Sequence, residues 1–94
     1  MLRVELGERA GAGRWRWRGT CGGRTVEGVS REPLLDACRE FKRMGVHPRA
    51  MACLFREGRE DWDLRTTVGH GAGVTVREDE REGPRFVRYR EYGR

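Results

Sequence analysis

The chain has 94 residues, which suits one domain built around one modest core. It has 20 basic and 15 acidic residues, a formal net charge of +5, and hydrophobic residues make up 36% of it. No apolar run approaches the ~20 residues of a membrane span, and residues 1–20 lack a signal-peptide pattern. We therefore expect a single cytoplasmic domain, residues 1–94, with no membrane partner.

The first segments of the chain alternate apolar and charged residues with a period of two. Residues 2–6 read LRVEL, and residues 14–18 read RWRWR after a glycine-rich connection. This period is typical of half-buried strands, because successive side chains on a strand point to opposite faces. We expect Trp15 and Trp17 to face the core and the arginines to face solvent, with a short third strand at residues 24–30.

One helix is predicted between a start signal at Ser30 and a stop signal at Gly45. Ser30 is expected to be the N-cap, and Pro33 is tolerated in the first turn, where the amides have no intrahelical partners. Apolar residues then recur every three or four positions, at Leu34, Leu35, Cys38, Phe41 and Met44. Gly45 is placed where a left-handed C-cap residue is needed, and Pro48 prevents the helix from resuming.

Strands are predicted again after the helix. Residues 50–55, AMACLF, are apolar on both faces and suit a central strand. Residues 62–68 alternate, with Trp62, Leu64 and Val68 expected to point inward, and residues 74–78 and 85–92 complete the series.

The order of these elements predicts the fold class. One helix cannot cover both faces of such a sheet, so we expect an α+β domain in which a curved antiparallel sheet of about five to six short strands packs on one central helix. The predicted core consists of Val4, Trp15, Leu34, Leu35, Cys38, Phe41, Phe55, Leu64, Val74 and Val76.

No group of residues suggests catalysis, a metal or a cofactor. Cys21, Cys38 and Cys53 form no C-x-x-C pair, and neither His47 nor His70 has a metal-ligand spacing to them. Nothing provides a nucleophile, a base and an orienting group together. We expect a protein without enzyme activity, metal or cofactor, whose thiols are reduced.

The arginines are the candidate binding residues because the charges are segregated along the chain. Residues 14–24 have four arginines and no acid, and residues 85–94 have four arginines and one acid, whereas acids gather at 57–63 and 78–82. If the last strand lies beside residues 14–18, one basic sheet face results. The predicted contacts to an anionic partner are Arg14, Arg16, Arg18, Arg24, Arg88 and Arg90. The alternative role of these arginines is a solvated outer face that keeps a small protein soluble.

Two families share a pattern with residues 14–44. The run VEGVSREPLLDACRE resembles HicB-like antitoxins, in which short strands lead through positions equivalent to Gly28 and Ser30 into a helix. The larger unit, basic aromatic strands followed by a helix, is similar to the arm-type DNA-binding domain of phage integrases. That domain sets a three-stranded sheet against DNA. Both resemblances imply a mobile-element context.

These observations predict a small non-enzymatic binding protein whose basic strand face contacts nucleic acid or a nucleoprotein. The alternative is a phage- or plasmid-encoded inhibitor or antitoxin that uses the same arginines on an acidic protein surface. A homodimer remains open in either case.

Overall fold

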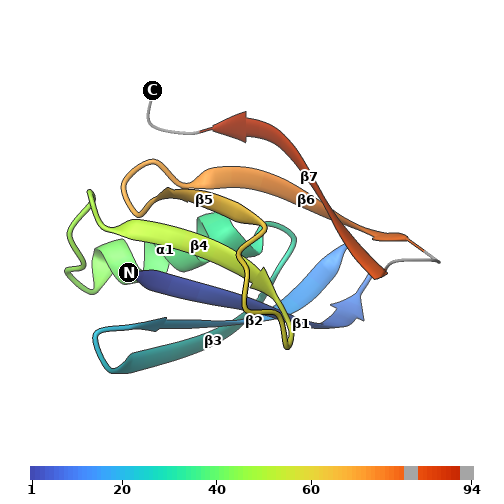
Figure 1. Cartoon of the computed structure of the whole chain (residues 1–94), viewed down its shortest axis with the longest axis horizontal. Helices are drawn as coiled ribbons and strands as arrows, with labels where there is room; N and C mark the ends of the chain where they lie inside the picture. Colours follow the sequence, from blue (N-terminus) through green and yellow to red (C-terminus); the bar gives the residue numbers. More distant parts are fainter. Residues whose placement is uncertain (80–82, 92–94) are drawn as a thin grey trace.

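A five-stranded mixed sheet with one helix against one face forms the centre of the structure (Figure 1). The structure is a computed structural model that describes the backbone of residues 1–79 and 83–91 and the side chains of residues 1–71. The strands and helix are, in chain order, β1 (Leu2–Gly11), β2 (Arg14–Cys21), β3 (Arg24–Ser30), α1 (Pro33–Arg43), β4 (Met51–Arg56), β5 (Leu64–Thr67), β6 (Ala72–Asp79) and β7 (Gly83–Glu91). The sheet order is β3-β2-β1-β4-β5, so the predicted α+β class and single helix are confirmed.

The first three strands form an antiparallel meander. Glycines make the tight connections: Gly22 and Gly23 have φ values of 57° and 78°, a conformation that suits a two-residue hairpin turn. The β2–β3 register is regular from Cys21↔Arg24 to Trp15↔Ser30. The β1–β2 register contains two irregularities between Leu6 and Gly11.

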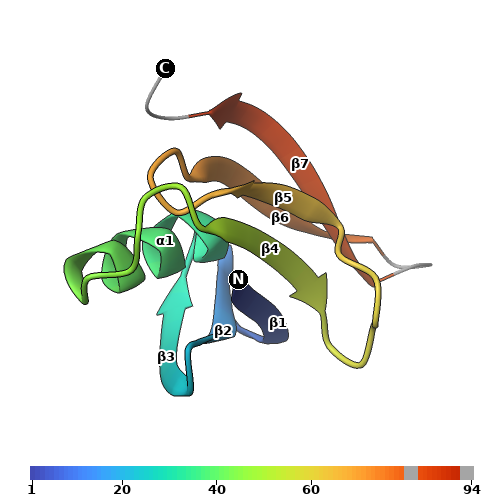
Figure 2. The same ribbon diagram turned by 60° about the vertical axis from the view of Figure 1, so that its left-hand side comes forward.

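The sheet departs from the expected antiparallel pattern at its centre, where β1 and β4 are parallel. The other neighbouring pairs in this sheet are antiparallel. The helix explains the parallel pair. Its 11 residues span about 16 Å, so it carries the chain back along the sheet. β4 therefore starts at the same end as β1 and β3 (Figure 1), and Figure 2 shows the same elements from a second direction.

The helix begins two residues later than predicted. Its N-cap position is Glu32, which makes no side-chain cap, so the assignment of Ser30 as N-cap is wrong. The buried Ser30 hydroxyl instead accepts a hydrogen bond from the Glu32 amide at 2.9 Å and donates one to the Asp36 carboxylate. It therefore ties the end of β3 to the first turn of the helix.

The end of the helix agrees with the prediction. Gly45 has a φ of 97°, its amide donates to the Lys42 carbonyl, and the Val46 amide donates to the Phe41 carbonyl. These two hydrogen bonds define a Schellman motif, which satisfies carbonyls that the helix leaves unpaired. Glycine is favoured here because a side chain would disfavour the positive φ.

The core lies between the sheet and α1, as the alternation predicted. Trp15 and Trp17 are buried on the helix side, and Arg14, Arg16 and Arg18 are exposed. The predicted core residues that are buried are Val4, Trp15, Leu34, Leu35, Cys38, Phe41 and Phe55. Leu64 is half-buried, and the side chains of Val74 and Val76 lie outside the described residues.

The opposite face of β4 is also apolar. Cys53 and Phe55 are buried there, and the Arg3 guanidinium lies 3.7 Å from the centre of the Phe55 ring. Trp62 was expected to point inward but is 48% exposed. The alternation fails at this residue because β5 begins only at Leu64, so Trp62 belongs to the preceding loop. The Arg65 guanidinium lies 5.1 Å from its ring.

The last two strands form a separate hairpin. β6 pairs with β7 in a two-stranded antiparallel sheet, and β6 lies beside α1. The backbone therefore places β7 next to β6 and not next to β2. The condition under which Arg88 and Arg90 would extend the face of β2 is not met.

The buried thiol of Cys38 is expected to lower the stability of the protein at alkaline pH. Burial raises the pKa of Cys38 from 9.0 to about 12. The folded state therefore holds a proton that the unfolded chain releases above pH 9, so stability is unaffected below pH 9 and falls from pH 9 to 12. We expect this thiol to lower the free energy of unfolding by up to about 1.4 kcal/mol per pH unit. Urea denaturation at pH 8, 9 and 10 measures the slope. Cys38→Ala should have the shallower slope, and equal slopes would contradict the prediction.

Candidate binding surfaces

The outer face of β2 carries the three arginines that the sequence singled out. Arg14, Arg16 and Arg18 alternate with the buried tryptophans and lie on the face of the sheet away from α1. Their neighbours on this face come from β1 and β3, because Arg18 is paired with Glu5 on one side and with Glu27 on the other. The structure thus keeps the arginines together on one face.

Glutamates accompany two of these arginines. Arg18 Nε lies 3.1 Å from a Glu27 carboxylate oxygen, and Arg16 Nε lies 3.5 Å from one of Glu8. Arg3 and Glu5 form a further pair at 3.1 Å. The side chains of Arg16 and Arg18 remain 61% exposed, so these pairs are weak. They nevertheless make the face mixed in charge, because neighbouring strands supply the acids that residues 14–24 lack.

A groove of about 610 Å³ runs over this face, between β3 and the loop that follows β4. Its charged residues are four glutamates and two arginines: Glu5, Glu8, Glu27, Glu57, Arg16 and Arg18. Strand positions such as Gly7, Gly28 and Val29 contribute the rest of its lining. Formal charge in the groove is thus −2, which disfavours a phosphate backbone at this place.

The other three predicted contacts are not part of this face. Arg24 follows the β2–β3 turn, and its Nη1 donates to the Met44 carbonyl at the end of α1, 3.1 Å away. Arg88 and Arg90 belong to β7, and their side chains lie outside the described residues.

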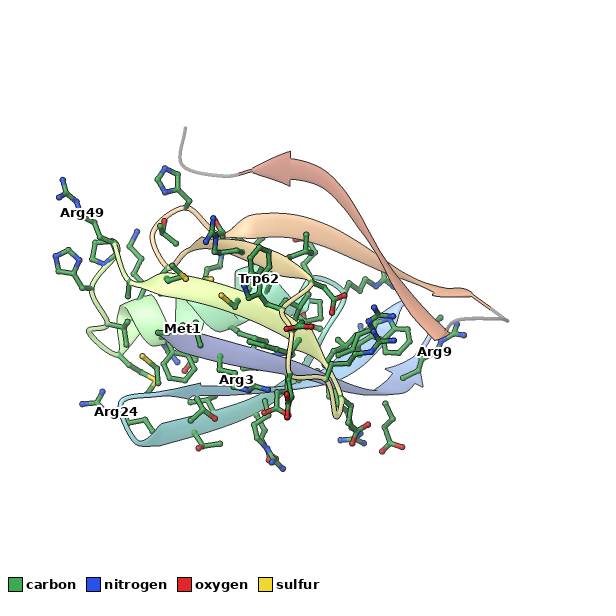
Figure 3. All side chains as sticks on the ribbon, viewed as in Figure 1. Met1, Arg3, Arg9, Arg24, Arg49 and Trp62 are labelled. Atoms are coloured by element: carbon green, nitrogen blue, oxygen red, sulfur yellow. The ribbon has the colours of Figure 1, made fainter. Side chains whose placement is uncertain are left out.

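A second, more basic surface lies at one end of the molecule. The β2–β3 turn, the α1–β4 loop and the β5–β6 turn meet at this end, because Arg3 pairs with Thr20, Leu2 with Ala52, and Met51 with Thr67. Two hydrogen bonds join the β5–β6 turn to the α1–β4 loop: the Val68 amide donates to the Ala50 carbonyl, and the Gly69 amide donates to the Pro48 carbonyl. Arg24 and Arg49 both lie at this end (Figure 3).

We call this surface the basic end and define it by its exposed cations and histidine: Arg24, Lys42, Arg43, His47 and Arg49. Arg43 forms an ion pair with Glu40. Lys42 and Arg49 make no ion pair with any residue whose side chain the structure describes. The acidic loop 57–63 follows the other end of β4, so the two charges are separated along the sheet.

The sequence does contain a signal for the basic end. Residues 41–56 have four basic residues and no acid. Lys42 and Arg43 belong to the last turn of the helix, where basic residues are favourable in any case, so this run did not stand out in the sequence as a binding site. Only the turn at Gly22 and Gly23 brings Arg24 to the same place, and that contact is not local in the sequence.

Three other kinds of evidence, namely metal-binding groups, membrane-spanning helices and similarity to known proteins, do not indicate a function for the described residues. Within residues 1–71, whose side chains are described, no three His, Cys, Asp or Glu side chains gather into a metal-binding group, and Cys21, Cys38 and Cys53 are free thiols. The one described helix is too short and too polar to cross a membrane. Comparison with protein-family models, with curated proteins and with solved structures finds no match for this chain.

Proposed function

We propose that this is a small non-enzymatic binding protein that holds the phosphate backbone of a nucleic acid at its basic end. One observation carries the proposal: the hydrogen bond from Arg24 to the Met44 carbonyl holds Arg24 at the end of α1, the end of the molecule where Lys42 and Arg49 are exposed and Glu40 pairs with Arg43. Lysine and arginine side chains that neutralise phosphates supply most of the affinity in sequence-independent binding.

Part of this charge also has a structural use. Lys42 and Arg43 are in the last turn of α1, where cations interact favourably with the negative end of the helix. Arg49 lies beyond the helix and has no such role. Arg24 is held by the Met44 carbonyl, and a guanidinium has further N–H groups that can reach a phosphate.

The location differs from the one that the integrase resemblance implies. That family sets a three-stranded sheet against DNA, and this chain has the matching order of three strands followed by a helix. Its outer face, however, carries Glu5, Glu8 and Glu27 among the arginines. The basic end offers a phosphate fewer opposing carboxylates, so we assign the contact to it.

Two triple variants with equal charge separate the surfaces. We expect the Arg24→Ala/Lys42→Ala/Arg49→Ala variant to bind a labelled 20-base-pair DNA more weakly than wild type. Its salt slope should fall by about 0.9 for each phosphate that the protein no longer neutralises. Fluorescence anisotropy between 50 and 200 mM salt measures both quantities. The matched control is Arg14→Ala/Arg16→Ala/Arg18→Ala, which has the same net charge and should keep most of the slope.

If the Arg14/Arg16/Arg18 variant loses more affinity and more salt slope than the Arg24/Lys42/Arg49 variant, the DNA-binding site lies on the outer face of β2. No binding by the wild type at 50 mM salt would refute the nucleic-acid function. Equal weakening in both variants would show attraction by net charge and no defined site. Thermal melts of both variants establish that each still folds.

The groove supports a second candidate function, a module that binds another protein. Its charges are of both signs, and Val29 beside them is 47% exposed. A mixed-charge surface with an apolar residue is better suited to a protein than to a polyanion. A partner that stays bound after nuclease treatment, and that the Arg14/Arg16/Arg18 variant no longer binds, would favour this candidate.

A further inference from the structure

The strand β3 forms an unprotected edge of the sheet. It is the terminal strand in the order β3-β2-β1-β4-β5, and no described strand pairs with its outer side. Its seven residues, RTVEGVS, pair with β2 in unbroken register and include no proline and no lysine. Edge strands in monomers are usually short, bulged, or blocked by such residues. The opposite edge strand, β5, has four residues.

The register shows which main-chain groups of β3 are free. Cys21 and Arg24 flank the two-residue turn and are the first hydrogen-bonded pair of the hairpin. Because hydrogen-bonded and non-hydrogen-bonded pairs alternate along an antiparallel ladder, Val26, Gly28 and Ser30 bond to β2. The amide and carbonyl groups of Thr25, Glu27 and Val29 therefore point away from the sheet.

The side chains along this edge are self-complementary under a two-fold axis. Val29 is exposed, Glu27 is exposed, and Arg31 follows directly after the strand with no ion pair among the described side chains. If two β3 strands pair antiparallel with Val29 opposite Val29 of the second copy, Glu27 lies opposite the second copy's Arg31, and the reverse pair forms by symmetry. A register centred on Glu27 would instead set two carboxylates opposite each other, which is unfavourable.

We propose that two copies of this chain associate through β3 and form one continuous sheet across a two-fold axis at Val29. The ladder runs from Glu27 to Arg31 in each copy and ends there, because Pro33 has no amide proton and begins the helix. The outward-pointing amide and carbonyl groups of Glu27 and Val29 then form hydrogen bonds with the main chain of the second copy. The proposal does not depend on nucleic acid and concerns a surface separate from the basic end.

Charge exchange tests both the partner and the register. In Arg31→Glu, Glu27 would face a glutamate of the second copy, and in Glu27→Arg, two arginines would face each other. We expect each variant alone to dimerise about tenfold more weakly than wild type, since two cross-strand pairs change from attractive to repulsive. Mixing the two variants restores both opposite-charge pairs, so the mixture should recover wild-type affinity. Sedimentation equilibrium from 10 to 500 μM protein, without nucleic acid, measures these constants.

Val29→Lys is a further variant that sets two like charges at the axis, and it should also abolish the dimer. Its exposed side chain touches little of the core, so its thermal melt should match that of wild type. A wild type that is monomeric at 500 μM overturns the proposal. A dimer that survives Val29→Lys, or two variants that do not rescue each other, would show that association uses another surface. Weaker DNA binding by the basic-end variant leaves this result unaffected, so the two proposals fail separately.

Discussion

Replacing Phe41 by alanine is expected to lower the free energy of unfolding by about 3–5 kcal/mol. The side chain is fully buried at the centre of the helix–sheet interface, in the cluster that includes Trp17, Leu2 and Leu34. Its ring fits against the strand so closely that a Cβ built at Gly19 would lie 2.7 Å from it. Removing the ring leaves a cavity that the rigid sheet cannot close.

The loss would be a large share of total stability, because a small domain is stable by only about 5–15 kcal/mol. Urea denaturation at pH 7 measures it. Lys42→Ala, at the next and exposed position, is the control and should change stability by about 0.5 kcal/mol or less. A loss below about 1 kcal/mol for Phe41→Ala would mean that the helix does not pack by this face.

Local patterns predicted the elements well because the information is contained in a few neighbouring residues. The alternation of RWRWR assigned Trp15 and Trp17 to the core, and the spacing of Leu34, Cys38 and Phe41 assigned the buried face of the helix. Gly45 was recognised because only a residue tolerant of positive φ fits that C-cap. Each of these features depends on a period or on one dihedral angle.

The features that were missed depend on the pairing of distant segments. Residues 14–24 contain no acid, yet Glu27 and Glu8 lie beside Arg18 and Arg16 because the strands of the meander are neighbours. The parallel β1–β4 pair depends on where the helix returns the chain. The basic end forms because the pairing of the strands places the β2–β3 turn and the α1–β4 loop at the same end of the sheet. A single sequence contains the charges but does not say which of them become neighbours, so the surface had to come from the structure.

Replacing Gly28 by valine should destabilise the protein by about 3 kcal/mol, although valine favours strands. Gly28 pairs with Trp17 across β2 and β3, and a Cβ built at Gly28 would lie 2.6 Å from two carbon atoms of the Trp17 indole. The large ring therefore occupies the space over the glycine, and a side chain there forces it out of the core. Tryptophan emission should shift to longer wavelength as Trp17 becomes exposed, and urea denaturation should give the change in stability.

The control for this substitution is Thr25→Val, on the exposed face of the same strand. It adds a similar side chain away from the indole and should leave stability within about 0.5 kcal/mol of wild type. Equal stabilities for the two variants would show that the indole can move aside without cost. The absence of a side chain at Gly28 would then not be what holds the Trp17 ring in the core.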